Sequence, residues 1–484
     1  MSPDERLVTQ ITAKSDDFSR WYAEIIRKTE MADYTPMKGM MVIRPYGYAV
    51  WEQIQRLMDA RIKASGHVNA YFPLFIPEGF LKKEAEHVQG FSPEVAWVTQ
   101  GGSDELEERL AGRPTSEAII GHMYSKWVKS WRDLPVLINQ WANIVRWEKV
   151  TRPFLRTTEF LWQEGHTCHA TAEEAEAETL SILAMYKDFC ETELAVPVIA
   201  GRKSAREKFA GAQMTYAIEG LMSDGKALQM GTSHNLGQHF AKAFDIKFED
   251  RAQQLSYVWQ TSWGTTTRLI GALVMVHGDD SGLRFPPRIA PLQAVIVPIS
   301  IGNWKTDVLP TAQAVEKELT RAGLRVRLDA REEFTPGWKY SDWEMRGVPL
   351  RVEIGPKDIQ KNQAVLVRRD IKKKEFVGLE ALAARAAAAL DEIQASLFEQ
   401  ALKLQRENTH EVSDYAGFKD IIENRRGFIK AWWCGDEACE DRIKEETMAT
   451  IRVLPLDGEA DRKPGPCVLC GRPGAELAYF ARAY

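Results

Sequence analysis

The segment NIVRWEKVTRPFLRTTEFLWQEGH, residues 143–166, contains two apolar runs on either side of a polar loop. This pattern predicts two antiparallel strands joined by a turn around residues 151–153. Alternate residues of a strand face the same side, so we expect Arg146 and Glu148 to share a face. Two interpretations of this pair remain open. It is either a surface ion pair, worth under ~1 kcal/mol, or a nucleotide site in which Arg146 binds a phosphate and Glu148 faces an adenine amino group.

A second segment, SWGTTTRLIGALV at residues 262–274, favours the nucleotide interpretation. Gly264 permits a close approach of the backbone, and Arg268 stands at the start of an apolar helical stretch, where anions are already favoured. A glycine–threonine loop before a helix is ordinary by itself. Here, however, two separate segments each carry an arginine in a setting that suits a nucleotide, and together they favour a nucleotide site over an ordinary loop.

Length and composition limit the class of protein. With 484 residues the chain is too long for one hydrophobic core, so we expect two to four domains. A formal net charge of −5 does not indicate a nucleic-acid binder, so a polyanion would have to meet a local group of Lys and Arg. No apolar run is long enough to span a membrane, and we expect a cytoplasmic protein.

Three regions differ in pattern and predict three domains. Residues 1–285 carry polar motifs between short apolar strands; here Ser15 is expected to cap a helix, and Thr171 with Glu174 predicts a capping box. Residues 286–404 alternate strands and helices, which predicts an α/β domain with a mixed sheet and a long final helix. Residues 405–484 have little apolar mass and are expected to form a small α+β domain.

Four of the six cysteines are close together in this last region, as Cys434-x4-Cys439 and Cys467-x2-Cys470. Two close pairs in a protein of the reducing cytoplasm match a closed, tetrahedral four-thiolate zinc site. Another metal, or four reduced thiols without a metal, are the alternatives. No histidine or open ligand position accompanies the four, so a structural role is expected. The two remaining cysteines are expected to be inert packing residues: Cys168 and Cys190.

Three motifs resemble the signature motifs of class II aminoacyl-tRNA synthetases. The segment from Gly39 to Pro73 is similar to the first motif, which lies at the dimer interface in that family. Arg146-x-Glu148 resembles the second, and the run from Gly264 to Arg268 resembles the third. The resemblance implies an α+β protein with an antiparallel-sheet catalytic core, a homodimer, and the use of ATP with Mg²⁺.

The similarity to prolyl-tRNA synthetases is closer and covers nearly the whole chain. It rests on residues 113–117 (RPTSE), 160–166 (FLWQEGH) and 231–234 (GTSH). It implies that Thr115 and Glu117 receive the substrate's amino group, which suits the cationic secondary amine of proline. The other residues implied in the proline pocket are Arg146, Trp162, Glu164, His166, Phe209 and His234. Those implied in the ATP site are Arg146, Glu148, Arg156, Thr157, Gln229, Thr232 and Arg268.

The implied reaction is in-line attack of the proline carboxylate on the α-phosphate, followed by transfer of prolyl to the 3′-terminal ribose of tRNA(Pro). Catalysis would consist of positioning and of charge neutralisation by Arg146, Arg268 and Mg²⁺. The alternatives are a threonyl, seryl, glycyl or histidyl enzyme, or a catalytically inactive RNA-binding regulator. A threonyl enzyme would hold zinc in its amino acid pocket, whereas Cys168 follows the element at residues 163–166 rather than replacing it.

Further expectations follow from the same resemblance. Only 95 residues, 167–261, separate His166 from Ser262, which leaves no room for an editing domain and is similar to the archaeal and eukaryotic type. The α/β domain resembles an anticodon-binding domain, with contacts expected from Arg351, Glu353 and Lys357. The carboxylate of Tyr484, the final residue, is expected to reach toward the active site.

Overall fold

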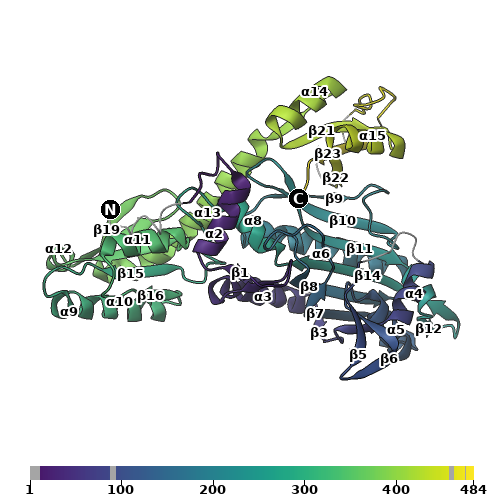
Figure 1. Ribbon diagram of the computed structural model, residues 1–484, viewed down its shortest axis with the longest axis horizontal. Coiled ribbons are helices and arrows are strands. Elements are labelled where there is room, and N and C mark those ends of the chain that lie inside the picture. Colours follow the sequence, from purple (N-terminus) through teal and green to yellow (C-terminus); the bar gives the residue numbers. More distant parts are fainter. Residues whose placement is uncertain (1–10, 88–93, 457–462, 475) are drawn as a thin grey trace.

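The computed structural model describes residues 11–87, 94–456, 463–474 and 476–484. The structure has three parts: a catalytic part that contains strands β3 (Val68–Asn69) to β14 (Trp259–Thr266), an α/β unit that contains β15 (Ala294–Pro298) to β19 (Lys374–Gly378), and a C-terminal part that contains β20 (Thr409–Glu411) to β23 (Glu476–Ala481). One long mixed sheet runs through the catalytic and C-terminal parts, and the α/β unit lies beside it (Figure 1). The order of the eleven strands is β20 (Thr409–Glu411), β21 (Phe428–Trp433), β23 (Glu476–Ala481), β22 (Thr450–Pro455), β9 (Val198–Arg202), β10 (Met214–Leu221), β11 (Ala227–Gly237), β14 (Trp259–Thr266), β8 (Glu159–His169), β7 (Val136–Val145) and β3 (Val68–Asn69).

The catalytic part of this sheet is antiparallel from β9 to β7, which confirms the predicted class II type of core. Helices α6 (Ala172–Thr192) and α8 (Arg268–His277) pack on it, and their apolar residues join Trp21, Trp51 and Trp263 in one buried core. Burial of such large aromatic side chains is the main favourable term in folding. This core supports the strands that carry the pocket residues.

Two helix starts test the capping predictions. Thr171 and Glu174 form the predicted capping box at α6. Helix α2 (Phe18–Lys28), in contrast, is capped by Asp17, whose carboxylate accepts from the backbone N–H of Arg20, so the prediction for Ser15 is wrong. A carboxylate at this position satisfies a free N–H and also interacts favourably with the helix dipole.

The predicted strand at residues 143–148 ends earlier than expected. Strand β7 ends at Val145, and its partner β8 begins at Glu159. Arg146 follows the strand, where its backbone N–H donates to Thr158 O at 2.8 Å and its side chain turns to Pro114 O at 2.9 Å. Arg146 and Glu148 therefore lie in a loop, and the expectation that they share a strand face is wrong.

The α/β unit has a mixed sheet, as predicted, and the sheet has five strands. Its order is β16 (Val326–Leu328), β15 (Ala294–Pro298), β17 (Leu350–Ile354), β18 (Gln363–Arg368) and β19 (Lys374–Gly378). The first three strands are parallel and the last two pairings antiparallel. Its helices are α9 (Trp304–Asp307), α10 (Leu309–Arg321), α11 (Pro336–Met345), α12 (Pro356–Gln360) and α13 (Leu382–Glu407), and α13 runs from this unit toward the C-terminal part (Figure 1).

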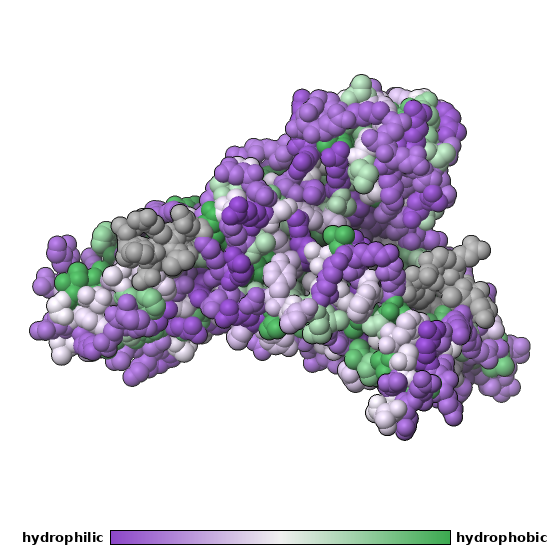
Figure 2. All heavy atoms as spheres, viewed as in Figure 1, coloured by the Kyte–Doolittle hydropathy of each residue, from purple (hydrophilic) through white to green (hydrophobic). Residues whose placement is uncertain are grey.

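The remaining elements complete the catalytic and C-terminal parts. They are β1 (Ala32–Tyr34), β2 (Met41–Ile43), α3 (Pro45–Ala64), β4 (Phe75–Pro77), α4 (Glu78–His87), β5 (Trp97–Gly101), β6 (Asp104–Gly112), α5 (Glu117–Trp127), α7 (His239–Ala243), β12 (Lys247–Glu249), β13 (Leu255–Tyr257), α14 (Tyr415–Asp420) and α15 (Glu437–Thr447). The viewed face is largely hydrophilic, with apolar residues mainly over the lower part of the catalytic unit (Figure 2). Among the described residues no helix is long and apolar enough to cross a membrane.

Candidate active site

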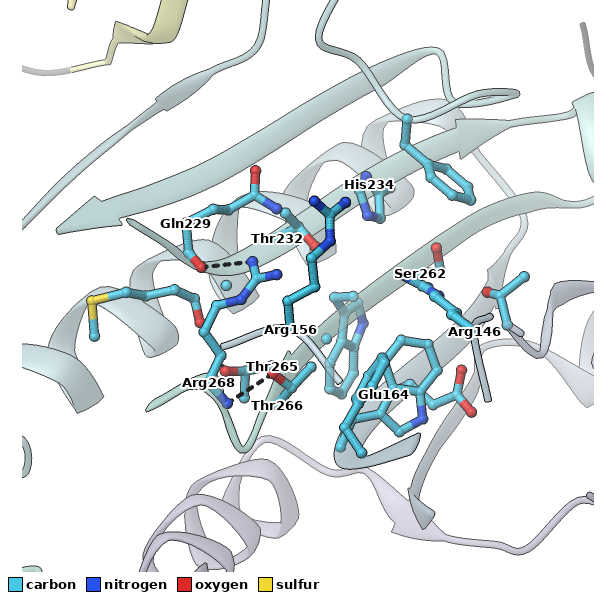
Figure 3. Close-up of a pocket in the computed structure, with 18 of the residues that line it drawn as sticks. Arg146, Arg156, Glu164, Gln229, Thr232, His234, Ser262, Thr265, Thr266 and Arg268 are labelled. Atoms are coloured by element: carbon cyan, nitrogen blue, oxygen red, sulfur yellow. Dashed lines mark hydrogen bonds between the residues drawn. The ribbon is translucent and has the colours of Figure 1, made fainter. Parts of the chain in front are cut away.

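A cavity of about 320 Å³ opens above strands β8, β11 and β14, beside the loop that follows β7. Every residue predicted for the proline and ATP sites lines it: Thr115, Glu117, Arg146, Glu148, Arg156, Thr157, Trp162, Glu164, His166, Phe209, Gln229, Thr232, His234 and Arg268. Figure 3 shows seven of these side chains around the cavity, on separate strands and loops: Arg146, Arg156, Glu164, Gln229, Thr232, His234 and Arg268. The second and third signature motifs therefore meet in one place, together with residues 113–117, 160–166 and 231–234.

The start of helix α5 places two polar side chains in the cavity wall. Thr115 donates its hydroxyl to the carboxylate of Glu117, and both residues are buried. Glu117 stands in the first turn of α5, where a negative side chain is favoured. The pair presents a carboxylate and a hydroxyl oxygen together, which is what a cationic amine requires.

A second buried carboxylate, Glu164 on β8, is already satisfied by the protein. It accepts from Ser116 Oγ at 2.5 Å and from Gln140 Nε2, and its other oxygen lies 2.9 Å from His166 Nε2. Burial would raise the pKa of Glu164, but His166, Ser116 and Gln140 outweigh burial and lower it. Burial likewise works against protonation of His166, yet Glu164 raises the pKa of His166 above its usual value. Glu164 therefore serves to orient His166.

Rings enclose the same end of the cavity. The centroids of Phe209 and His234 are 4.7 Å apart, and His234 Nδ1 lies 3.0 Å from Thr215 Oγ1. Burial, with the nearby charge of His166, lowers the pKa of His234 to about 3. His234 is therefore an uncharged ring at physiological pH, and it lies beside Phe209 in the cavity wall.

The other end of the cavity is cationic. Arg268 donates to Gln229 O at 3.2 Å and Leu155 O at 3.3 Å, and Arg146 donates to Pro114 O. Burial and then the charge of Arg146 lower the pKa of Arg268 to about 10. Within the described chain both guanidinium groups bond backbone carbonyls rather than carboxylates, so their charge remains available for an anion. Arg156, in contrast, pairs with Glu148 at 2.9 Å.

Several residues of the site were not predicted from the sequence. Ser116 and Gln140 hold Glu164, yet a glutamine within a strand has no pattern that distinguishes it from a surface residue. Ser262 Oγ, and the Nε1 atom of the predicted pocket residue Trp162, are buried in the cavity wall without a hydrogen-bond partner among the described residues. Unsatisfied buried polar atoms cost free energy, so their presence here is consistent with a bound ligand.

The predicted anticodon residues lie in the α/β unit. Arg351 donates to Glu353 Oε1 at 2.9 and 3.0 Å, and its guanidinium lies 4.2 Å from the centroid of the Tyr340 ring. Lys374 Nζ lies 3.4 Å from the other carboxylate oxygen of Glu353. The structure thus brings Arg351 and Glu353 together, whereas Lys357 lies on helix α12 and is exposed.

The four C-terminal cysteines meet as predicted. The Sγ atoms of Cys434, Cys439, Cys467 and Cys470 all lie within 4.8 Å of one another. The distance is 3.6 Å from Cys434 to Cys439 and 3.8 Å from Cys434 to Cys470. Four thiolates about 2.3 Å from a tetrahedral zinc would be about 3.8 Å apart, so the cluster fits a metal of this kind. Arg472 lies beside two of the sulfur atoms and adds a positive charge to the cluster.

The two other cysteines are buried in apolar surroundings, and burial raises the pKa of both thiols: Cys168 and Cys190.

Tyr484 packs against the catalytic core, where its hydroxyl donates to Asp224 at 2.7 Å and its ring lies 5.4 Å from the Arg152 guanidinium. Arg152 belongs to the loop after β7 that borders the cavity. Tyr484 itself is not among the residues that line the cavity.

Comparison with known families matches three parts of the chain. The tRNA synthetase class II core domain (G, H, P, S and T) matches residues 97–277, and the anticodon binding domain matches residues 293–388. The C-terminal domain of prolyl-tRNA synthetase matches residues 415–484. The matches follow the chain order of the catalytic sheet, the α/β unit and the cysteine-bearing part.

Similar proteins extend over the full length. The chain is 57% identical over 483 residues to a proline–tRNA ligase of Natranaerobius thermophilus, with 99% of each chain covered. It is 59% identical over 477 residues to one of Rubrobacter xylanophilus, also with 99% of each covered, and 55% identical over 484 residues to one of Ruminiclostridium cellulolyticum, with 100% of each covered. With such similarity along its whole length, and with its second and third signature motifs meeting in one cavity, the chain belongs to the prolyl-tRNA synthetase family of class II aminoacyl-tRNA synthetases.

Proposed function

We propose that this chain activates L-proline with ATP and transfers the prolyl group to tRNA(Pro), and that the cavity residues have the roles predicted above. One observation carries the substrate assignment. Glu164 is satisfied by Ser116, Gln140 and His166, so Glu117 with Thr115 is the carboxylate–hydroxyl pair that can receive an amine. The neutral rings of Phe209 and His234 beside it suit the apolar ring of proline.

The reaction needs only positioning and charge neutralisation. A carboxylate oxygen of proline attacks the α-phosphorus of ATP, the bond to the β-phosphate oxygen breaks, and pyrophosphate leaves. The 3′-terminal ribose hydroxyl of the tRNA then attacks the prolyl carbonyl, and AMP leaves with the mixed-anhydride oxygen. Arg146 and Arg268 neutralise the phosphates and Arg146 orients the carboxylate, and Mg²⁺ would supply further positive charge there.

Two alternatives are less well supported. A threonyl enzyme would need a metal in the cavity, but within the described parts of the chain the cysteine and histidine side chains form a metal-binding group only at the four C-terminal cysteines. Cys168 is absent from the cavity lining. An inactive regulator would have lost nucleotide-binding residues, whereas Arg146, Gln229 and Arg268 all line the cavity.

The assembly, location and metal are also proposals. We expect a homodimer, because the segment from Gly39 to Pro73, which resembles the dimer motif, exposes Val42, Tyr48, Val68 and Tyr71. We expect the protein to work in the cytoplasm. The cysteine cluster would hold a structural Zn²⁺, which the thiolates would bind without an open position for substrate. The three domains would be residues 1–285, 286–404 and 405–484.

The enzyme is expected to lack editing activity. Residues 167–261 form α6, β9 to β11, α7, β12, β13 and the start of β14, which are parts of the catalytic unit rather than an inserted domain. Because the pocket must admit proline, it rejects smaller amino acids poorly. Deacylation of Ala-tRNA(Pro) by the purified protein would contradict this expectation.

Pyrophosphate exchange tests the proposed function. Each of the twenty amino acids is supplied separately with ATP and labelled pyrophosphate, without tRNA. Strong exchange with proline, and much weaker exchange with alanine and cysteine, is expected. Exchange with threonine or serine instead would overturn the substrate assignment, and no exchange in a folded, ATP-binding protein would favour the regulator.

A further inference from the structure

The C-terminal part shares its sheet with the catalytic part. Strand β22 pairs with β9, with Leu454 opposite Arg202 and Pro455 opposite Gly201. The approach is so close that a Cβ added at Gly201 would lie 2.4 Å from Leu454 O. The two parts therefore meet through backbone hydrogen bonds and not through side chains alone, as the continuous run from β21 to β11 in Figure 1 shows.

A second backbone contact joins the chain's end to the strand that carries the ATP residues. The N–H of Ala227 donates to Arg482 O at 2.8 Å, and the N–H of Tyr484 donates to Ala227 O at 3.1 Å. Ala227 is the first residue of β11, and Gln229 and Thr232 follow on the same strand. The C-terminal part thus contacts both β9 and the beginning of β11.

A buried ion cluster lies between these contacts. Arg452 of β22 donates to both carboxylate oxygens of Glu219 on β10, at 2.8 and 3.2 Å. Lys203 Nζ lies 2.7 Å from Glu219 Oε1 and donates to Arg452 O at 2.7 Å. Glu219 is 0% exposed, Lys203 3% and Arg452 7%. A buried carboxylate of this kind is stable only while its cationic partners remain in place.

The cluster is adjacent to the ATP side of the cavity. Glu219 pairs with Gln229 across β10 and β11, and the carbonyl of Gln229 accepts from Arg268 Nη1 at 3.2 Å. Burial and Arg146 lower the pKa of Arg268, and the negative charge of Glu219 opposes that change. The side-chain hydrogen bonds of Arg268 among the described residues go to backbone carbonyls, and Arg452 is a further positive charge that lowers its pKa.

We propose that Glu219 and Arg452 are positioning residues of the ATP site, and that through them the C-terminal domain sets the affinity for ATP. Arg452 fixes the carboxylate with two hydrogen bonds, so that the negative charge stays opposite Gln229 and favours Arg268 in its observed place. Without Arg452 the carboxylate loses two hydrogen bonds and this orientation, so that the pairing of Glu219 with Gln229, and with it the place of Arg268, is no longer held. The inference rests on the proposed function, because it takes Gln229 and Arg268 as ATP-binding residues.

The test compares Michaelis constants in proline-dependent pyrophosphate exchange. Arg452→Met should raise the KM for ATP about tenfold, as expected for the loss of a charge-assisted hydrogen bond, and change the KM for proline by less than about twofold. Arg452→Lys, which retains the charge, should restore most of the loss. Arg206→Ala is the matched control. Arg206 lies 2.5 Å from Asp441 in an exposed ion pair that also joins the catalytic part to the C-terminal part. Its loss should change neither Michaelis constant.

Other results would overturn the inference. A purely structural role predicts a lower melting temperature with an unchanged KM for ATP, or an equal rise in both constants. If Arg452→Met does not fold, Arg452→Gln, which keeps a side-chain donor toward Glu219 but no charge, must show the rise in the KM for ATP without one for proline. Calorimetric titration of a non-hydrolysable ATP analogue measures the same site without proline. Weaker binding by the variant there supports the inference even if wild-type exchange is absent, and equal binding overturns it.

Discussion

Ser116 Oγ donates to Glu164 Oε1 at 2.5 Å, so the N-terminus of helix α5 and strand β8 share one buried carboxylate. This bond places Glu117, the next residue, beside Thr115 in the cavity wall. The two carboxylates are therefore distinguished by their surroundings. Glu164 accepts hydrogen bonds from several donors of the protein. Glu117 accepts one from the hydroxyl of Thr115 and otherwise lines the cavity.

Glu117→Gln should weaken proline binding specifically. A hydrogen bond between charged groups contributes roughly 1.5–3 kcal/mol, so the KM for proline should rise about 10- to 100-fold while the KM for ATP stays within about twofold. Pyrophosphate exchange gives both constants. Thr115→Ser keeps the hydroxyl and should remain close to wild type. An unchanged KM for proline in Glu117→Gln would remove Glu117 from the amine site.

Cys467→Ser should lose the C-terminal metal. The purified wild-type protein is expected to contain one zinc per chain, because four sulfur atoms lie at the spacing of a tetrahedral site. Metal analysis of the variant should show less zinc, and thermal unfolding should begin several degrees lower. Cys190→Ala removes a buried thiol far from the cluster in sequence and should retain its zinc. Purified wild-type protein that contains no metal, and that unfolds at the same temperature as Cys467→Ser, would contradict the assignment of a zinc site.

Stability should fall in acid partly because of His277. Burial lowers the pKa of this residue to about 3, whereas an unfolded histidine titrates near 6.5. Between these values only the unfolded chain takes up the proton, so stability is complete above pH 6.5 and decreases as the pH falls, by about 1.4 kcal/mol per pH unit for this one group.

Urea unfolding at pH 6 and pH 4 measures whether the free energy of unfolding decreases as the pH falls. His277→Gln keeps a donor toward Leu194 O, which lies 2.9 Å from His277 Nε2, but cannot be protonated. The stability of the wild type relative to this variant should therefore decline as the pH falls. A difference that is constant with pH would mean that His277 does not titrate on unfolding.

Arg351→Ala should separate the two halves of the reaction. Arg351 bonds Glu353 and stacks near Tyr340, a planar and polar group suited to an unstacked base. Aminoacylation of tRNA should fall about 10- to 100-fold, while pyrophosphate exchange without tRNA should not change. Arg321→Ala, an exposed arginine at the end of α10 in the same unit, is the control. Equal loss of both activities would exclude an anticodon role.

Deletion of Tyr484 tests the predicted role of the final residue. Its ring lies 5.4 Å from the Arg152 guanidinium and 4.9 Å from Lys226 Nζ, so its removal should loosen the loop beside the cavity. We expect a lower kcat/KM for ATP. Tyr484→Phe, which loses only the bond to Asp224, should have a smaller effect. Unchanged kinetics after the deletion would end the hypothesis.

The sequence predicted the parts of the fold that depend on local pattern. Periodicity located the α/β unit, and the spacing of the four cysteines located their cluster, because both signals lie within short stretches of chain. The motif residues also met in one cavity. The loop that carries Arg146 was predicted as a strand, since its apolar neighbours alternate in the same way as those of β7.

Contacts between distant segments were not predictable from one sequence. Gln140 and Ser116 meet Glu164 only after β7, β8 and α5 have packed. The pairing of β22 with β9 joins residues about 250 positions apart, and neither strand has a pattern that selects the other. Such pairings depend on the whole packing of the molecule, in which many strands of similar composition compete.

The most direct test of the account is a crystal structure with a non-hydrolysable prolyl-adenylate analogue. The prolyl amine is predicted to lie within hydrogen-bond distance of Thr115 Oγ1 and Glu117, with the ring against Phe209 and His234 and the phosphate between Arg146 and Arg268. A ligand bound outside this cavity, or one whose amine contacts Glu164 in place of Glu117, would contradict the central claim.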